Sequence, residues 1–162
     1  MQYNEFMDDA NNIKNISIEL SSISTYESGV VQSTAFRVLG KHVTEILKKY
    51  DISMMQWFVL GTIYSSGTGG IRLTDLAKKV DTGLPFLTNL INMLVQKGMV
   101  YRVSNVDDSR SKFVVVTPSF SPKCRVIEKD LRKNLRAKLY QHISQDDLRT
   151  YIKVLYQLAA LR

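Results

Sequence analysis

The stretch from Gly98 to Thr117 constrains the fold of this chain more than any other part of the sequence. Two short runs of β-branched and aromatic residues, 99–103 and 113–117, flank a polar segment, 104–112, that is rich in charged and turn-forming residues. This pattern predicts a β-hairpin whose charged tip projects away from the core. Directly upstream, the tripeptide Asp81-Thr82-Gly83 joins two short helical patterns. Two helices, a turn and a charged hairpin together predict a winged helix, and nucleic acid is then the leading partner.

Apolar residues at helical spacing predict that most of the remaining chain is helical. Ser53 is the expected N-cap of one helix, while Pro85 stands in the first turn of another and Gly98 follows its end. The expected helices cover residues 31–50, 53–64, 74–80, 84–97, 122–142 and 144–161, with one short strand at 71–73. We therefore expect a mainly α (α+β) fold, in which helices on both sides carry a winged helix-turn-helix.

The excess positive charge is concentrated in the last part of the chain. Residues 1–50 carry 5 basic and 6 acidic side chains, residues 51–100 carry 4 and 3, and residues 101–162 carry 13 and 6. The formal net charge of +7 therefore comes from the hairpin onward. Beside a winged helix, attraction to DNA phosphates explains this distribution better than a solvated helix surface alone.

Cysteine content and hydropathy point to a reducing, aqueous compartment. Cys124 is the single cysteine, so no internal disulfide forms. The polar, acidic segment 1–12 is unlike a secretory signal, and the most apolar stretch, 52–64, is shorter than the ~20 residues that span a membrane. We expect a cytoplasmic protein without membrane contact. Cys124 lies between Lys123 and Arg125, so an oxidant-sensing thiolate is an alternative to a structural role.

The sequence lacks the residue patterns that catalysis requires. The glycine-rich segment 65–70 is not followed by the Gly-Lys-Ser/Thr of a phosphate-binding loop. His42 and His142 stand in no metal-ligand spacing, and no nucleophile has a matching base. We therefore expect no enzymatic activity, no cofactor and no metal.

Five segments, in order and with consistent spacing, resemble motifs of the MarR family of winged-helix transcription regulators. Residues 52–60 (ISMMQWFVL) are similar to the family's Leu-Thr/Ser-x-x-Gln-aromatic-x-x-Leu, and residues 73–77 (LTDLA) to its Leu-Ser/Thr-Glu-Leu-Ala. Residues 94–100 (LVQKGMV) resemble Leu-x-x-Lys-Gly-hydrophobic-Val at the end of the recognition helix. Residues 108–110 (DSR) fall on the wing-tip Asp-x-Arg, and residues 114–117 (VVVT) on the closing strand.

The resemblance implies a homodimeric, sequence-specific DNA-binding regulator of transcription, most often a repressor. Residues 29–50 and 121–162 would form the helical dimerisation region, and residues 51–120 the DNA-binding domain. Residues 1–28 would be an N-terminal arm or weak helix. The resemblance also implies a small aromatic or phenolic effector in a crevice between the two regions. Aromatic residues that could line it are Phe36, Trp57, Phe58, Tyr64 and Tyr140, with core packing as the alternative, which we favour for Trp57.

The recognition helix departs from the family where an arginine usually follows Thr88. That position is Asn89 here, and Asn92 shares the polar face. Because asparagine can pair with adenine in the major groove, we expect all three residues to contact base edges. The missing arginine leaves a second hypothesis open, a winged-helix adaptor that acts through protein contacts with weak or no autonomous DNA binding.

The predicted hairpin supplies the remaining candidates for DNA contact. Arg110, at the wing tip, is expected to reach the minor groove, and Lys112 a phosphate. Asp108 is expected to position Arg110 or Arg102 by a salt bridge, because phosphate repels a carboxylate. Arg102, at the hairpin base, bonds either a phosphate or a partner within the wing.

Overall fold

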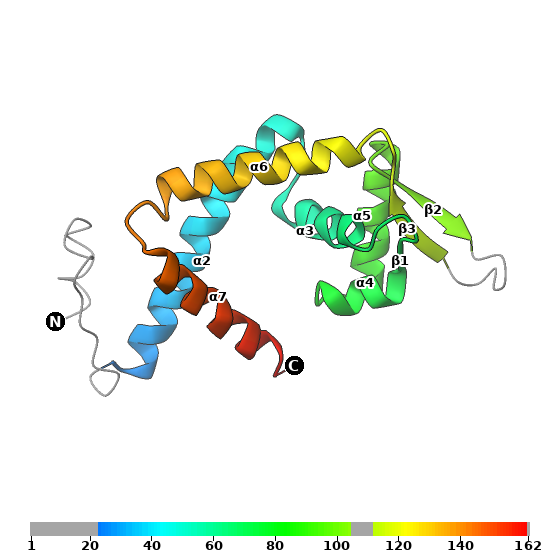
Figure 1. Cartoon of the computed structure of the whole chain (residues 1–162). Helices are drawn as coiled ribbons and strands as arrows, with labels where there is room; N and C mark the ends of the chain where they lie inside the picture. The colour runs from blue at the N-terminus through cyan, green and yellow to red at the C-terminus, as the bar shows by residue number, and fades with distance from the viewer. Residues whose placement is uncertain (1–22, 105–111, 162) are drawn as a thin grey trace. The chain divides into compact units, whose positions relative to one another are not determined.

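The computed structural model describes residues 23–104 and 112–161, and its fold is mainly helical with one small antiparallel sheet (Figure 1). This confirms the predicted fold class. The elements are α2 (Thr25–Leu47), the 3-10 helix η3 (Lys48–Tyr50), α3 (Met54–Ser65), β1 (Ile71–Arg72), α4 (Leu73–Lys79), α5 (Leu84–Gln96), β2 (Val100–Ser104), β3 (Lys112–Val116), α6 (Ser121–Lys138) and α7 (Gln145–Ala159).

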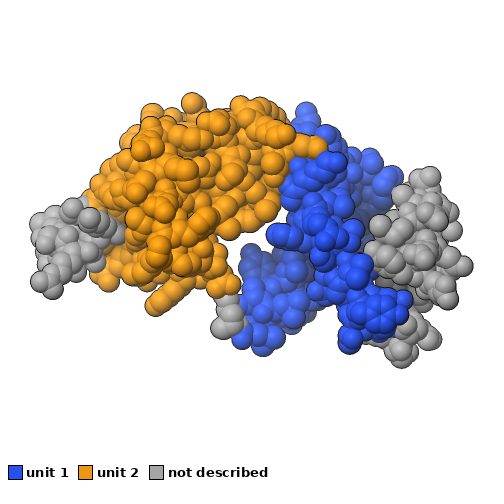
Figure 2. Space-filling view, turned by 180° about the vertical axis from the view of Figure 1, so that it is seen from behind, with its two compact units in different colours: residues 1–42, 133–162 blue, residues 43–132 orange. Residues whose placement is uncertain are grey.

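The chain divides into two compact units, coloured separately in Figure 2. Unit 2, Val43–Arg132, contains the winged helix together with the end of α2 and most of α6. Unit 1 consists of Met1–His42 and Lys133–Arg162. Within unit 2, the hydroxyl of Tyr50 donates to a carboxylate oxygen of Asp130 at 2.9 Å, which ties η3 to α6.

The core of the winged helix consists of apolar side chains at the spacing that the sequence predicts. On α5 the buried residues Leu87, Leu90, Ile91 and Leu94 recur at helical spacing and form one face. They are joined in the core by fully buried side chains from α3, α4, the sheet and α6, namely Val59, Leu60, Ile63, Leu76, Val100, Val114 and Ile127. Removal of this apolar surface from water is the main force that holds the unit together.

The three strands lie in the order β1-β3-β2, all antiparallel. Val100 pairs with Val116, and Ile71 of β1 pairs with Val114 on the other side of β3. Gly70, at φ +68°, precedes β1, and a Cβ atom there would lie 2.6 Å from the carbonyl oxygen of Val114. The glycine-rich segment before β1 therefore allows this close approach to β3, which gives Gly70 a structural role.

The local signals at helix ends act as predicted. Ser53 and Gln56 form a capping box at the start of α3, in which each side chain accepts a hydrogen bond from the other residue's backbone N–H. Pro85 lies in the first turn of α5, and Gly98 takes φ +66° directly after the helix. Ser144 caps α7 by accepting a bond from the Asp147 backbone at 3.0 Å.

Two predicted helix boundaries are wrong. The first helix begins at Thr25 rather than 31, because Ser24 and Glu27 form a capping box there, with backbone-to-side-chain bonds of 3.0 and 3.3 Å. The predicted helix 122–142 ends at Lys138. The chain must leave the helix before the extended N-cap residue Ser144, and the guanidinium of Arg136 donates to the carbonyl of Ile143 at 3.2 Å across the resulting turn.

Candidate nucleic-acid interface

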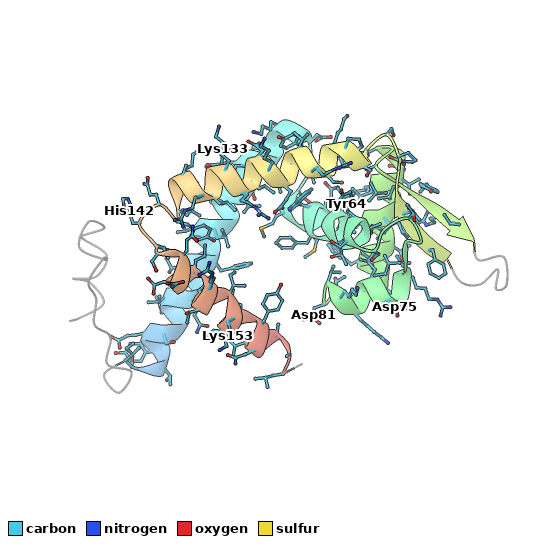
Figure 3. The ribbon with its side chains drawn as sticks, in the orientation of Figure 1. Tyr64, Asp75, Asp81, Lys133, His142 and Lys153 are labelled. Carbon is cyan, nitrogen blue, oxygen red and sulfur yellow. The ribbon has the colours of Figure 1, made fainter. Side chains whose placement is uncertain are left out.

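The helix-turn-helix is formed by α4 and α5 with a tight turn between them. Asp81, labelled at the end of α4 in Figure 3, has φ 51°, a left-handed conformation that aspartate tolerates in turns. The backbone N–H of Thr82 returns to the carbonyl of Ala77 at 3.0 Å, and α5 starts after Gly83. The turn therefore lies where the sequence predicts it.

One face of α5 is buried and the opposite face is free for a partner. Asn89 and Asn92 are both exposed, as predicted. Thr88 is half-buried, and its hydroxyl donates to the carbonyl of Leu84 at 2.7 Å, so only its oxygen lone pairs remain for a ligand. The structure thus brings the three predicted recognition residues to the accessible side of one helix, with Thr88 the least available.

Arg102 projects from β2 to the recognition helix. Its guanidinium donates to the side-chain oxygen of Asn92 at 2.6 Å. Arg102 was predicted to bond either a phosphate or a partner within the wing. The structure shows a bond to a protein partner, and that partner lies on α5 rather than in the hairpin. A hydrogen bond from a charged donor is shorter and stronger than one between neutral groups.

The other predicted wing residues are only partly within the described structure. Asp108 and Arg110 lie outside the described residues. Lys112 is the first residue of β3, where it pairs with Ser104 at the open end of the hairpin next to the tip.

Two exposed apolar residues of α5 lie beside Asn89 and were not among the site residues predicted from the sequence. Phe86 is 52% exposed and Met93 is 46% exposed. They lie three residues before and four residues after Asn89, so the three side chains share one stripe of the helix. An accessible aromatic ring suits contact with the 5-methyl group of thymine in the major groove. The spacing around Asn89 was the available signal.

A second missed feature is an open depression at the start of α5. Its volume is about 580 Å³, and its lining includes Lys78, the N-cap Gly83 and the acidic residue Asp81. No side chain caps the N-terminus of α5, where the helix dipole favours an anion. Lys78 is exposed in the last turn of α4 and brings a cation to this place. Lys78 and the helix N-terminus favour a phosphate of a nucleic-acid backbone at this place, and the carboxylate of Asp81 opposes it.

The thiolate proposed for Cys124 is contradicted by its surroundings. The side chain is only 2% exposed and lies with Ile127 and Leu131 among the buried residues of α6. Loss of hydration raises the pKa of the thiol to about 11, because burial disfavours the charged form. Lys123 and Arg125 are exposed and do not overcome this effect. Cys124 is therefore a packing residue and not a reactive thiolate at neutral pH.

The aromatic residues predicted to line a ligand crevice lie in both units. Phe36 and Phe58 are exposed, whereas Trp57, Tyr64 and Tyr140 are half-buried, so the core packing expected for Trp57 is incomplete. Within unit 2, Tyr64 (Figure 3) lines a cavity of about 600 Å³. Tyr101, Val115 and Arg125 also line it.

The described residues contain neither a metal-binding cluster nor a membrane-spanning helix. Among them, no group of three or more histidine, cysteine, aspartate or glutamate residues could hold a metal ion. Within the same residues, no helix combines the length and the apolar character that a membrane crossing needs.

Comparison with known proteins agrees with this geometry. The model of the MarR family matches residues 52–112. The multiple antibiotic resistance protein MarR of Salmonella typhimurium is 28% identical over 104 residues, which cover 64% of this chain and 71% of that protein. An uncharacterised HTH-type transcriptional regulator of Staphylococcus aureus is 24% identical over 126 residues, 77% of this chain and 85% of that protein.

Solved structures share the fold over nearly the whole chain. A cysteine-to-serine variant of Escherichia coli MarR complexed with operator DNA has a TM-score of 0.73 at 23% identity, covering 84% of this chain and 99% of that one. The MepR–DNA complex of S. aureus has a TM-score of 0.71 at 21% identity, covering 86% and 100%. The order of the motifs, the winged helix and these matches agree: residues 52–112 match the MarR family model, and the chain is similar to winged-helix transcription regulators of that family.

Proposed function

We propose that this protein is a homodimeric, sequence-specific DNA-binding repressor that acts in the cytoplasm and has no catalytic activity. The observation that carries the proposal is the division of α5 into a buried apolar face and an exposed face that holds Asn89 and Asn92. A helix with this division, next to a β-hairpin, is built to enter the major groove. Two structures with this fold, those of MarR and MepR, contain DNA.

The interface divides into contacts that read bases and contacts that position the protein. Asn89 and Asn92 offer amide groups to base edges, and Phe86 offers an apolar surface for thymine methyl groups. Lys78 and the N-terminus of α5 attract a phosphate. Arg110 and Lys112 of the wing add electrostatic attraction to the duplex. Because α5 lacks the family's arginine, a larger share of the affinity comes from these phosphate contacts.

The proposed dimer is supported by α7, whose apolar residues are left partly exposed by the described part of the chain. Ile152, Leu155 and Leu158 are 42%, 42% and 56% exposed, and none of the described residues of α7 is buried. A second copy of the chain would cover this face and place two winged helices on one pseudo-palindromic operator. The expected spacing between half-site centres is about one helical turn, roughly 10 base pairs.

Modulation by a small aromatic or phenolic ligand is part of the same proposal. The cavity next to Tyr64 combines the phenol rings of Tyr64 and Tyr101 with an apolar wall at Val115 and the exposed guanidinium of Arg125. These groups suit a planar ligand with an acidic substituent. Thermal stabilisation of the protein by such a compound, lost in Arg125→Ala, would support this site.

The test is binding of the purified protein to the DNA upstream of its own gene, measured by footprinting at several salt concentrations. We expect a protected pseudo-palindrome and an affinity that falls steeply with salt, because phosphate contacts release counterions. Asn89→Arg, which restores the family's usual residue, should raise the affinity several-fold. Gln141→Arg adds the same charge in the exposed loop between α6 and α7, and should have little effect.

The second candidate, an adaptor that works through protein contacts, is favoured by the uncharged exposed face of α5. It predicts no footprint, and no gain from Asn89→Arg beyond that of Gln141→Arg. A flat salt response together with specific capture of a protein partner by the wild-type chain would replace the repressor proposal.

A further inference from the structure

The hydrogen bond between the wing and the recognition helix has a consequence for DNA sequence preference. Arg102 lies in the middle of β2, where it pairs with Val114 of β3, so its backbone is held by the sheet. Asn92 lies on the exposed face of α5, and the two side chains meet at 2.6 Å. The contact therefore joins two ordered elements.

The chemistry of arginine fixes which way the Asn92 amide is turned. A guanidinium has only donors, so the group that faces it must be the amide oxygen. The amide is planar, and its nitrogen is consequently directed away from Arg102. Among the described residues no partner is found for that nitrogen, so Asn92 presents an NH₂ donor to the surroundings while one lone pair of its oxygen is held by Arg102.

An asparagine held in this way reads DNA differently from a free one. Pairing with adenine needs both amide groups, the oxygen for adenine N6–H and the nitrogen for adenine N7. Because a charged donor already holds one lone pair of the oxygen and fixes the amide plane, the NH₂ group is the part of Asn92 that is free to face DNA. It suits base edges that carry only acceptors, which are guanine N7 and O6 and thymine O4. Cytosine offers a donor, and the N6–H donor of adenine would have to share the Asn92 oxygen with the guanidinium of Arg102.

We propose that Arg102 is a positioning residue, which holds the Asn92 amide so that it selects guanine or thymine over adenine. This inference rests on the proposed DNA binding. Asn89 supplies the internal comparison. It is exposed on the same helix, and the described residues provide no hydrogen-bond partner for its side chain, so both amide groups remain available for adenine. The two asparagines of one recognition helix then have opposite base preferences.

The test is selection of bound sequences from a randomised operator library by wild-type protein and four variants. Loss of preference in Asn92→Ala identifies the base position that Asn92 reads. For wild type we expect a preference for guanine or thymine at this position. For Arg102→Met we expect the preference to shift towards adenine by about fivefold or more, because a good bidentate pair discriminates between bases by at least that factor. Arg102→Lys keeps a donor-only side chain and should keep the wild-type preference. Lys112→Met removes the same charge and should weaken binding to all sequences equally.

Two results would overturn the inference: an adenine preference of wild type at the Asn92 position, or an unchanged preference in Arg102→Met. A further measurement separates this failure from a failure of DNA binding itself. In the free protein at low temperature, the guanidinium protons of Arg102 should exchange with water more slowly in wild type than in Asn92→Ala, as seen by NMR. Equal exchange rates would remove the contact on which the inference rests, whether or not DNA binds.

Discussion

Helices α5 and α7 have similar lengths and similar patterns of apolar residues, yet their surroundings differ completely. In α5 the apolar stripe of four residues, Leu87, Leu90, Ile91 and Leu94, is buried within unit 2. In α7 the equivalent stripe remains exposed, and none of its described residues is buried. The periodicity of a sequence thus identifies an amphipathic helix, but it does not say whether the cover comes from the same chain.

The winged helix and α7 therefore differ in what stabilises them. The winged helix buries its own core and should fold without help. The apolar surface of α7, together with exposed residues of α2 such as Phe36 at 63% exposure, requires a second surface to leave water. Substitutions in the two regions should therefore differ in whether their effects depend on protein concentration.

The largest effect is expected from a charge in the exposed stripe of α7. Leu155→Asp should convert the dimer into an 18.5 kDa monomer, because an aspartate in an apolar interface loses its hydration without gaining a partner. DNA affinity should fall by orders of magnitude, since one half-site alone then holds the protein. Sedimentation velocity and footprinting measure the two effects.

Thr150→Asp is the matched control for this change, because it adds the same charge to the opposite face of α7. It should leave both the oligomeric state and DNA binding unchanged. A wild-type protein that sediments as a monomer, or a Leu155→Asp variant that still dimerises, would show that α7 is covered in some other way.

A core substitution in the winged helix should cost stability without changing the oligomeric state. Leu60 is fully buried in α3, so Leu60→Ala should lower the free energy of unfolding by about 2–5 kcal/mol through lost burial and a cavity. In urea titrations this loss should be the same at low and high protein concentration. Ser65→Ala, at an exposed position of the same helix, should change it by less than about 0.5 kcal/mol. A concentration-dependent loss for Leu60→Ala would mean that the winged helix does not complete its own core.

Local signals allowed much of the fold to be predicted, whereas contacts between elements did not follow from them. Pro85 and Gly98 bracket α5 because they act on the backbone next to them. The bond from Arg102 to Asn92 joins residues ten positions apart in different elements, and it depends on how the hairpin packs against the helix. Phe86 lies outside the predicted buried stripe of α5, and only its exposure beside Asn89 in the structure indicates a part in the DNA-facing surface.

The buried thiol of Cys124 provides a separate test of the core of unit 2. Since the pKa of Cys124 is raised to about 11, its contribution to stability is present below the ordinary value of 9.0 and is lost as the pH rises towards 11. At pH 8 iodoacetamide should therefore modify the native protein far more slowly than the urea-unfolded protein. Rapid alkylation of the native protein, at the rate of an exposed thiol, would contradict the burial of Cys124 on α6.

The smallest effect is expected from the two capping boxes, one in each unit, which differ in one chemical group. Ser53→Ala removes the cap of α3 and should cost about 1 kcal/mol in urea unfolding at any pH between 4 and 7, because Gln56 does not titrate.

At α2 the hydrogen bonds from Ser24 lower the pKa of Glu27 below its ordinary value of 4.5. A lowered pKa stabilises the folded state above that value, and the stabilisation disappears as the pH falls through the folded-state pKa. The cost of Ser24→Ala should therefore be smaller at pH 3 than at pH 7, and Glu27→Gln, which keeps an acceptor without a charge, should abolish that pH dependence. An equal cost of Ser24→Ala at both pH values would show that the charge of Glu27 contributes nothing to the start of α2.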